Sequence, residues 1–327
     1  RGGDDRVTLR DVIIGDPNDD SDNTGLAQFA GKRLDLDGGV FTATGAVQKL
    51  VLGDVTDTTM TFDGNYGRGT DLTLGQLTDV TINADTGFNK LTIINWTDSD
   101  VTEDAINARW INKLSVKGSK GNGVSGNFDT NLTLTGEGAG RYTLDTISVK
   151  GEVNGRTWDI NGNIKAMKVD SFVDSDIDID GHTAKLSIGH MLGGSLTVKS
   201  VDKLATTIAK YVDGSTGDFT ADLNITGNKS SKFSVKTLSI KGDVENANWD
   251  VAGKIGALVV KGNTDGLTLN VVDEDDLKLD AQLDKLVLNT VDDADITVEG
   301  TIGFVKAVSW TTGSITAEEI TKSKLPA

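Results

Sequence analysis

The stretches TISVKGEVNGRTWDINGNIKAMKV (residues 146–169) and TLSIKGDVENANWDVAGKIGALVV (residues 237–260) decide the fold expected for this chain. They align without a gap, and the match includes two rare residues, Trp158 and Trp249. The same offset extends the match backwards, so that residues 126–169 align with residues 217–260. Self-similarity at a fixed offset predicts an internal duplication and therefore a repeat protein.

Pairs of apolar residues separated by one residue recur along the chain, as in Leu50/Leu52 and Leu114/Val116. Alternation with a period of two predicts short β-strands. Two kinds of strand can be distinguished: the first reads KLSV, KLSI or TISV, and the second reads WDI or WDV. A glycine commonly closes each strand, and we expect it to supply the positive φ of a tight corner. One strand of each kind with its turns makes a unit of roughly 20 residues.

A unit of this length, with almost no helical periodicity, predicts an all-β chain folded as a parallel β-solenoid, or β-helix, of about 13 short coils. The duplicated segment corresponds to a block of four coils. Strands at this spacing are also typical of antiparallel sandwiches, which form the main alternative. A membrane barrel requires longer strands and aromatic girdles, whereas aromatic residues are only 5% of this chain.

The expected organisation has three parts. Residues 1–30 form an acidic segment and cap, residues 31–313 the solenoid, and residues 314–327 a tail. Three segments carry residual helical character and are expected as exceptions to the β pattern: VTEDAINARWINKL (residues 101–114), KLATTIAKYV (residues 203–212) and the terminal TAEEITKSK.

Composition excludes several classes of function. A net charge of -17 argues against binding the nucleic-acid backbone, which requires an excess of Lys and Arg on the contacting face. Cysteine is absent, so thiolate metal sites and disulfides are excluded. No run of apolar residues is long enough for a transmembrane segment, and the first residue is Arg rather than Met. We therefore expect a processed protein, secreted to the extracellular cell surface.

The sequences IGALVVKG, INKLSVKG and DTISVKGEV resemble the I-x-x-L-x-V-x-G repeats of long exported bacterial β-solenoid proteins of the cell surface. The resemblance covers residues 40–313, although coil lengths vary and no anchor motif is visible. Proteins of this type are adhesins, surface-layer subunits and extracellular filament components. The resemblance implies a structural role without catalysis.

Candidate catalytic groups are few. The two histidines, His182 and His190, lie beside glycine turns, where histidines are usually solvated. Aspartates alternate in DSDIDID (residues 174–180), a row that could handle acidic sugars as in the polysaccharide lyases built on β-helices, but also the pattern of a charged solvent face. We favour the solvent face. No nucleophile or nucleotide-binding motif is present, so we expect no enzymatic activity.

The segment DPNDDSDNTG offers the clearest ligand signal, because Asp16, Asn18, Asp20 and Asp22 recur at every second position. Hard cations bind several oxygens from one flexible loop, and the spacing resembles the first half of an EF-hand or dockerin loop. Ser21 and Ala27 replace the Gly and Glu of that pattern, so a bound Ca²⁺ would need a further ligand. Other acidic groups, expected to be solvated turns, are Asp98, Asp100, Glu103 and Asp104; Asp273 to Asp276; and Asp292, Asp293 and Asp295.

These observations predict a structural, self-assembling extracellular protein, such as a surface-layer or filament subunit, stabilised by Ca²⁺. Its main partner would be a further copy of itself in a homopolymer or lattice. The alternatives are an adhesin or polysaccharide-binding β-helix that contacts cell-surface polysaccharide, and a polysaccharide lyase-like enzyme.

Overall fold

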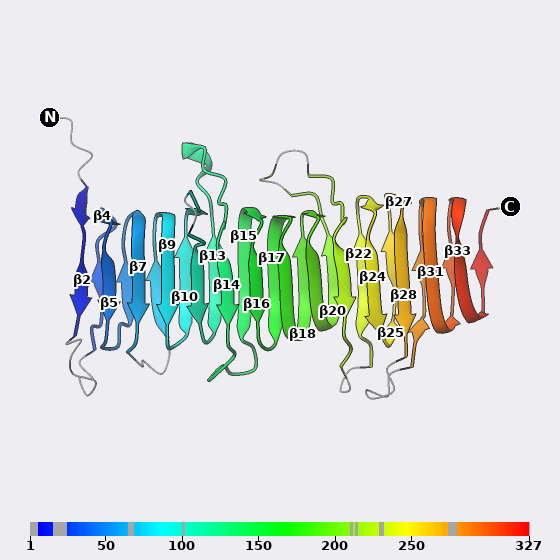
Figure 1. Ribbon diagram of the computed structural model, residues 1–327, viewed down its shortest axis with the longest axis horizontal. Coiled ribbons are helices and arrows are strands. Elements are labelled where there is room, and N and C mark those ends of the chain that lie inside the picture. Colours follow the sequence, from blue (N-terminus) through cyan, green and yellow to red (C-terminus); the bar gives the residue numbers. More distant parts are fainter. Residues whose placement is uncertain are drawn as a thin grey trace. The chain divides into compact units, whose positions relative to one another are not determined.

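The computed structural model describes residues 6–15, 25–64, 69–99, 102–209, 212, 215–228, 232–273 and 280–326 (Figure 1). These residues are almost entirely β-strand and turn, and the helical exception among them is one 3-10 turn, Lys120–Asn122. That turn is far too short to cross a lipid bilayer, and no other described segment is helical. The chain divides into two compact units, Arg1–Gly162 and Asn163–Ala327.

The strands of the first unit form three columns, in which each strand lies beside the equivalent strand of the next turn. Column 1 contains β3 (Phe29–Ala30), β6 (Lys49–Val51), β8 (Thr70–Thr73), β10 (Phe88–Ile93), β13 (Ile111–Val116) and β15 (Leu144–Asn154). Column 2 contains β1 (Val7–Leu9), β4 (Leu34–Asp37), β11 (Asn95–Thr97) and the first parts of β7 (Val55–Phe62) and β9 (Gln76–Ala84). Column 3 contains the second parts of β7 and β9 with β2 (Val12–Ile14), β5 (Val40–Ala43), β12 (Ala105–Ala108), β14 (Asn131–Leu134) and β16 (Thr157–Ile160).

The second unit repeats the three columns. Column 1 contains the first part of β17 (Ile164–Val173) and the last parts of β18 (Asp176–Ile188) and β20 (Ser195–Thr206). It continues with β22 (Val235–Ile240), β25 (Lys254–Ile255), β26 (Leu258–Val260), β29 (Gln282–Leu283), β30 (Leu286–Val287), β32 (Val305–Lys306) and β34 (Ser323–Lys324). Column 2 contains the end of β17 with β19 (Met191–Leu192), β23 (Val244–Glu245), β27 (Asn263–Asp265) and the first part of β31 (Thr290–Ile302). Column 3 contains the first parts of β18 and β20 with β21 (Asp222–Ile225), β24 (Asn248–Ala252), β28 (Leu267–Val272) and the central parts of β31 and β33 (Ser309–Ile320).

Within each unit, every strand pair among the described residues is parallel, and the apolar positions of successive turns align. Leu50 lies opposite Leu72 in the first unit, and Leu238 lies opposite Leu258 in the second. These side chains are fully buried, so each turn covers the apolar side of the turn before it. The fold is therefore all-β and β-helix-like, as predicted, and the described residues form no antiparallel sandwich.

The structure contains a column that the sequence analysis did not separate. Column 2 follows column 1 after a glycine, and most of its segments are only two or three residues long. A segment this short buries a single large side chain, such as Val55, Leu77 or Trp96, and so shows no alternating pair. The strand pairing also extends past residue 313, because β33 pairs with β31 as far as Ile320.

The three expected helical segments contain no helix where the structure describes them, and each of them contributes residues to strands. Residues 105–108 and 111–116 form β12 and β13, residues 203–206 belong to β20, and residues 316–320 belong to β33. The prediction of helical character was wrong because pairing with both neighbouring turns decides the conformation of a short segment more strongly than its own propensity.

The two tryptophans of the duplicated segment occupy equivalent places, as predicted. Both side chains are fully buried in column 3, in β16 and β24. The indole Nε1 of Trp158 donates to the main-chain oxygen of Thr130 at 3.2 Å, and that of Trp249 donates to the oxygen of Ala221, also at 3.2 Å. The duplication therefore preserves packing and hydrogen bonding as well as sequence.

Several glycines at the end of column 1 serve a purpose that differs from the expected one, although Gly118 has the expected positive φ (60°). Gly242 does not have a positive φ, and a Cβ added to it would lie 2.0 Å from Oδ1 of Asp218 on the preceding turn. That same oxygen accepts a hydrogen bond from the backbone N–H of Asp243 at 2.8 Å. The same arrangement recurs at Gly53, Gly75, Gly151 and Gly262, each against an Asp or Asn oxygen.

Glycine is thus required at these positions because the Asp or Asn oxygen of the preceding turn occupies the place where a Cβ would lie. From there it bonds to the backbone of the next turn. Positive φ is found instead at glycines that close column 3, such as Gly136 (φ 77°) and Gly227 (φ 85°). There the expected conformational reason holds.

Replacing Gly242 by Ala should destabilise the protein by about 2 kcal/mol or more, because the new methyl group must displace the Asp218 carboxylate and nearby backbone. The matched control is Gly140→Ala, since a Cβ there meets no atom within 4 Å and its φ is not positive. The control should be neutral or slightly stabilising. Urea unfolding of both variants measures the difference, and equal stabilities would contradict the packing role of Gly242.

Candidate functional site

The residues predicted from sequence to bind Ca²⁺, Asp16, Asn18, Asp20 and Asp22, lie outside the described residues. The calcium loop therefore stays a prediction. The aspartate row of residues 174–180 is exposed on the outer side of β18, as expected for a charged solvent face. Two of its members are held by the next turn: Asp176 accepts from Ser195 Oγ at 2.7 Å, and Asp180 pairs with Lys199.

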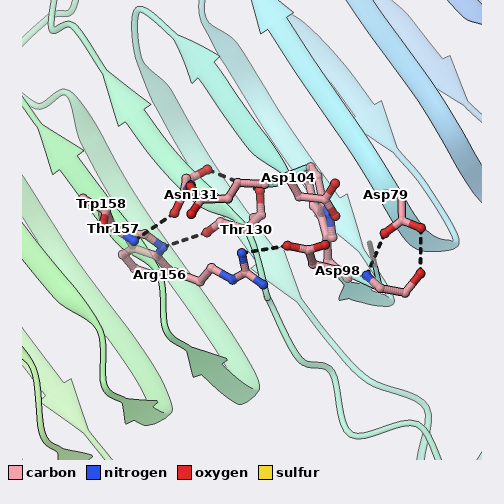
Figure 2. Close-up of polar contacts among 11 residues, drawn as sticks. Asp79, Asp98, Asp104, Thr130, Asn131, Arg156, Thr157 and Trp158 are labelled. Carbon is pink, nitrogen blue, oxygen red and sulfur yellow. Dashed lines mark hydrogen bonds and ion pairs between the residues drawn. The ribbon is translucent and has the colours of Figure 1, made fainter. Parts of the chain in front are cut away.

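A different group of carboxylates, in the first unit, forms the candidate site. Asp79, Asp98 and Asp104 each offer an oxygen within 4.8 Å of the others. We call these three residues the acidic cluster (Figure 2). The register explains why they meet: Thr78 of β9 lies opposite Thr97 of β11, which places Asp79 and Asp98 on consecutive turns. Asp104 directly precedes β12, the strand that pairs with the second part of β9.

Asp79 is hydrogen-bonded to the next turn of the chain. Its Oδ1 accepts from the backbone N–H of Ser99 and its Oδ2 accepts from Ser99 Oγ, both at 2.7 Å. Asp79 has a φ of 55°, the left-handed conformation that Asp and Asn tolerate better than most residues. This local bend fixes the carboxylate at the boundary between columns 2 and 3.

Asp98 is paired with a cation, the guanidinium of Arg156. Its Oδ2 lies 2.8 Å from Nη1 of Arg156, and the two side chains are only 7% and 15% exposed. The other oxygen of Asp98, Oδ1, is buried and accepts no hydrogen bond. Figure 2 shows Arg156 reaching one oxygen of Asp98, and carboxylate oxygens of Asp98 and Asp104 lie within 4.8 Å of each other.

The position of Arg156 depends on the strand that follows it. Thr157 N–H donates to Oδ1 of Asn131 at 2.9 Å, and Asn131 Nδ2 donates to Oε2 of Glu103 at 2.6 Å. Pairing of β16 with β14 therefore carries the guanidinium to the acidic cluster (Figure 2). The cation comes from a turn more than fifty residues away in sequence from Asp98.

Asp104 is the most buried member, at 2% exposure. Its Oδ2 accepts a hydrogen bond from the indole Nε1 of Trp96 at 2.6 Å. Burial raises the pKa of Asp104 to about 7, with a smaller contribution from the negative charges of Asp98 and Asp79, and the Trp96 hydrogen bond only partly offsets the rise.

A fourth carboxylate adds to the excess of negative charge. Burial raises the pKa of Asp129 to about 6, although the charge of Arg156 opposes that rise. Its Oδ1 is also buried without a hydrogen-bond partner. In this part of the described structure, Asp98 pairs with Arg156, Asp129 feels its charge, and Asp79 and Asp104 lie near Asp98. This excess of negative charge favours protons or a further cation.

The acidic cluster is reachable from solvent. A depression of about 260 Å³ at the surface is lined by Asp79 and Asp104 together with Asp57, Thr58, Thr59, Thr81 and Thr102. Its lining is rich in carboxylate and hydroxyl oxygens, the donors that hard divalent cations prefer. The arrangement can therefore hold a proton or a divalent ion at the same place.

The sequence predicted solvated turns at Asp98 and Asp104, and this prediction was wrong: both side chains are largely buried, Asp104 bonded to Trp96 and Asp98 paired with Arg156. Apart from the alignment of successive turns, nothing in the sequence indicated that Asp79 and Arg156 would lie beside Asp98 and Asp104. Asp100 is outside the described residues.

Both histidines bind serines of neighbouring turns. His190 is buried, contrary to the expectation of a solvated turn, and its Nε2 lies 2.7 Å from Ser171 Oγ. His182 Nδ1 lies 3.0 Å from Ser200 Oγ, and its Nε2 lies 3.5 Å from Oδ2 of Asp202. This grouping contains the residue types of a hydrolytic triad, but Ser200 is fully buried and a substrate cannot reach its hydroxyl in this conformation.

A second depression, of about 560 Å³, lies in the second unit beside His182 and Asp202. Asn163, Asn228, Lys232, Phe233 and Lys236 complete its lining. In contrast to the acidic cluster, it combines amides, lysines and one aromatic ring. The residues come from four segments of column 1 or its flanks, which the stacking of turns brings together.

The pKa of Asp104 leads to a specific pH dependence. Because its pKa rises from 3.8 in the unfolded chain to about 7 in the fold, the folded state binds the proton more tightly, and stability falls as the pH rises from about 4 to about 7. In the presence of a chelator, the free energy of unfolding should decrease by up to about 4 kcal/mol across this range through this group.

Asp104→Asn keeps an oxygen for Trp96 but cannot ionise, so it should flatten this part of the pH profile and stabilise the protein at pH 8. The exposed Asp176→Asn removes the same charge and should leave the profile unchanged. Denaturant unfolding at several pH values tests both variants. A profile of Asp104→Asn as steep as that of the parent would contradict the assignment.

No known protein family, characterised protein or solved structure shows significant similarity to this chain.

Proposed function

We propose that this chain is a structural, self-assembling protein of the extracellular cell surface, a surface-layer or filament subunit without catalytic activity. In this proposal the entire chain is a parallel β-solenoid of about 13 short coils. The observation that carries the proposal is the β-helix-like pairing itself, in which a strand edge of one turn is completed only by the next turn. Such an architecture favours growth by further strands of the same kind.

Strands at both extremes of the described pairing offer open edges. Among the described residues β1 and β2 pair only with β4 and β5, and β33 and β34 pair only with β31 and β32. Exposed apolar side chains lie on or beside these strands: Val7, Ile13, Val308, Ile320 and Leu325. Pairing of the β33–β34 edge of one copy with the β1–β2 edge of another is heterologous, and such contacts build open filaments when they do not close into rings.

Lysine on an open edge blocks pairing with another strand. The double variant Val7→Lys/Ile320→Lys should therefore reduce the assembled fraction at least tenfold in sedimentation velocity, with assemblies absent from electron micrographs. The matched control is Val40→Lys, which adds a lysine at an exposed position of β5, a strand that is already paired on both sides, with β2 and β7. A parent protein that stays monomeric at all concentrations, or equal assembly of both variants, would overturn the proposal.

We also propose that a divalent cation, Ca²⁺ by its preference for carboxylate oxygens, stabilises the fold at the acidic cluster. Two observations support this. Asp98 is more than nine-tenths buried and has an oxygen with no hydrogen-bond partner beside Asp104, and the surrounding carboxylates exceed the available positive charge. A cation would replace the proton that Asp104 otherwise holds, and would join three consecutive segments of columns 2 and 3.

Calcium should therefore stabilise the protein more at pH 8 than at pH 5, because protons compete for the same oxygens. At about 100 times its dissociation constant the ion adds about 2.7 kcal/mol to the free energy of unfolding. Asp104→Asn should remove most of this gain, whereas Asp20→Asn/Asp22→Asn, in the loop predicted from sequence, should not. Thermal melting with calcium and with chelator decides between the sites: a loss confined to the loop variant would move the cation to residues 16–22.

A second candidate function is a polysaccharide-binding module or adhesin. The observation that favours it is the depression beside His182, because its amides, lysines and aromatic ring are side chains suited to sugar hydroxyls and acidic groups. Binding of purified cell-wall polysaccharide in a pull-down with the full chain tests this function, and absence of binding to neutral and acidic polymers alike would exclude it.

A further inference from the structure

The depression beside His182 combines residues from several turns of the second unit. His182 of β18 lies opposite Ser200 of β20, and Val201 lies opposite Val235 of β22. This register places Asp202 and Lys236 next to each other on consecutive turns, on the outer side of column 1. The surface is therefore built by the stacking of turns and does not depend on one loop.

The depression is lined by two lysines, whereas the chain as a whole is strongly acidic. Lys232 and Lys236 line the depression, and within the described part of the chain neither is paired with a carboxylate. Some lysines of the same unit are paired, as Lys199 is with Asp180 and Lys254 is with Asp284, whereas others, such as Lys185 and Lys241, have no ion pair among the described residues. The two lysines of the lining supply positive charge at this place in a protein with a net charge of -17.

The carboxylate among the lining residues, that of Asp202, lies near the imidazole of His182. Asp202 Oδ2 lies 3.5 Å from Nε2 of His182, and His182 is fixed from the other side by Ser200 and by the hydrogen bond from its backbone N–H to Asn163 Oδ1 at 2.8 Å. Lys236 lies beside Asp202 on the next turn, but neither Lys232 nor Lys236 forms an ion pair among the described residues, so both ammonium groups can meet an anion.

Phe233 positions one of these lysines. The Nζ of Lys232 lies 5.5 Å from the centre of the Phe233 ring, and the Nζ of Lys254 lies 5.2 Å from it, so the ring attracts both cations. Asn163 and Asn228 add amide groups, which can hydrogen-bond to hydroxyls. Ammonium groups, amides and an apolar ring in a depression of about 560 Å³ fit an acidic sugar better than a bare inorganic ion.

We infer that this depression binds the carboxylate groups of an acidic oligosaccharide, with Lys232 and Lys236 as the anion-binding residues. The inference rests on the second of the two proposed functions and names its ligand class and site. It requires neither self-assembly nor the cation at the acidic cluster, which belongs to the first unit.

Isothermal titration calorimetry of the full chain with hexagalacturonate tests the inference, with a neutral hexasaccharide and with sodium sulfate as comparison ligands. The variant Lys232→Gln/Lys236→Gln should lose at least tenfold in affinity for hexagalacturonate while its melting temperature is unchanged. The matched control is Lys90→Gln/Lys113→Gln, two exposed lysines stacked on consecutive turns of the first unit, which should bind within twofold of the parent. Raised salt should weaken binding by the parent more than by the Lys232→Gln/Lys236→Gln variant.

The other possible results distinguish a failure of this binding site from a failure of the polysaccharide-binding function. Hexagalacturonate binding that is equally reduced in both double variants, or unchanged in both, overturns the site while leaving a polysaccharide-binding function. Equal binding of the neutral hexasaccharide overturns the acidic ligand class only. Sulfate binding as tight as that of hexagalacturonate would show a general anion site and overturn the oligosaccharide, and absence of binding to every ligand would overturn both proposals.

Discussion

The structure depends on a hydrogen bond that joins one turn to the next. At the end of column 1, an Asp or Asn oxygen accepts the backbone N–H that follows a glycine on the succeeding turn, as Asp218 does from Asp243. The oxygen can approach only because the glycine has no Cβ. Where two parallel turns meet at a corner, the strand ladder is interrupted and backbone N–H groups lose their partners. The side-chain oxygen accepts a hydrogen bond from such an N–H group and fixes the register between consecutive turns.

This constraint also accounts for some of the aspartates of the chain, namely Asp35, Asp54, Asp218 and Asp243. An aspartate that serves the next turn is needed at one corner after another, whereas lysines are free to remain on exposed strand faces, as Lys90 and Lys113 do. Repeated corners place carboxylates above one another. Most remain near solvent, where charge is inexpensive, but a large side chain such as Trp96 can bury one of them. Within the acidic cluster, Asp79 likewise accepts a backbone N–H from the next turn, that of Ser99.

The two depressions differ because their turns supply different side chains to the same kind of surface. Around Asp104, one guanidinium faces several carboxylates, so the site favours protons or hard cations. Around His182, the carboxylate of the lining lies near the imidazole, and two lysines line the same depression. A stacked fold permits such variation because the buried positions specify the turn, whereas the outward positions change without cost to the core.

The sequence by itself determined the strand period, the duplication and the equivalence of Trp158 and Trp249, because alternation and spacing are local properties that stacking preserves. It could not separate column 2, whose segments are too short to alternate. Nor could it identify the acidic cluster, because Asp79, Asp98 and Arg156 come from different turns and meet only through the register. Burial of Asp104, and hence its raised pKa, follows from those neighbours. Only the tertiary structure decides which of many similar aspartates loses contact with water.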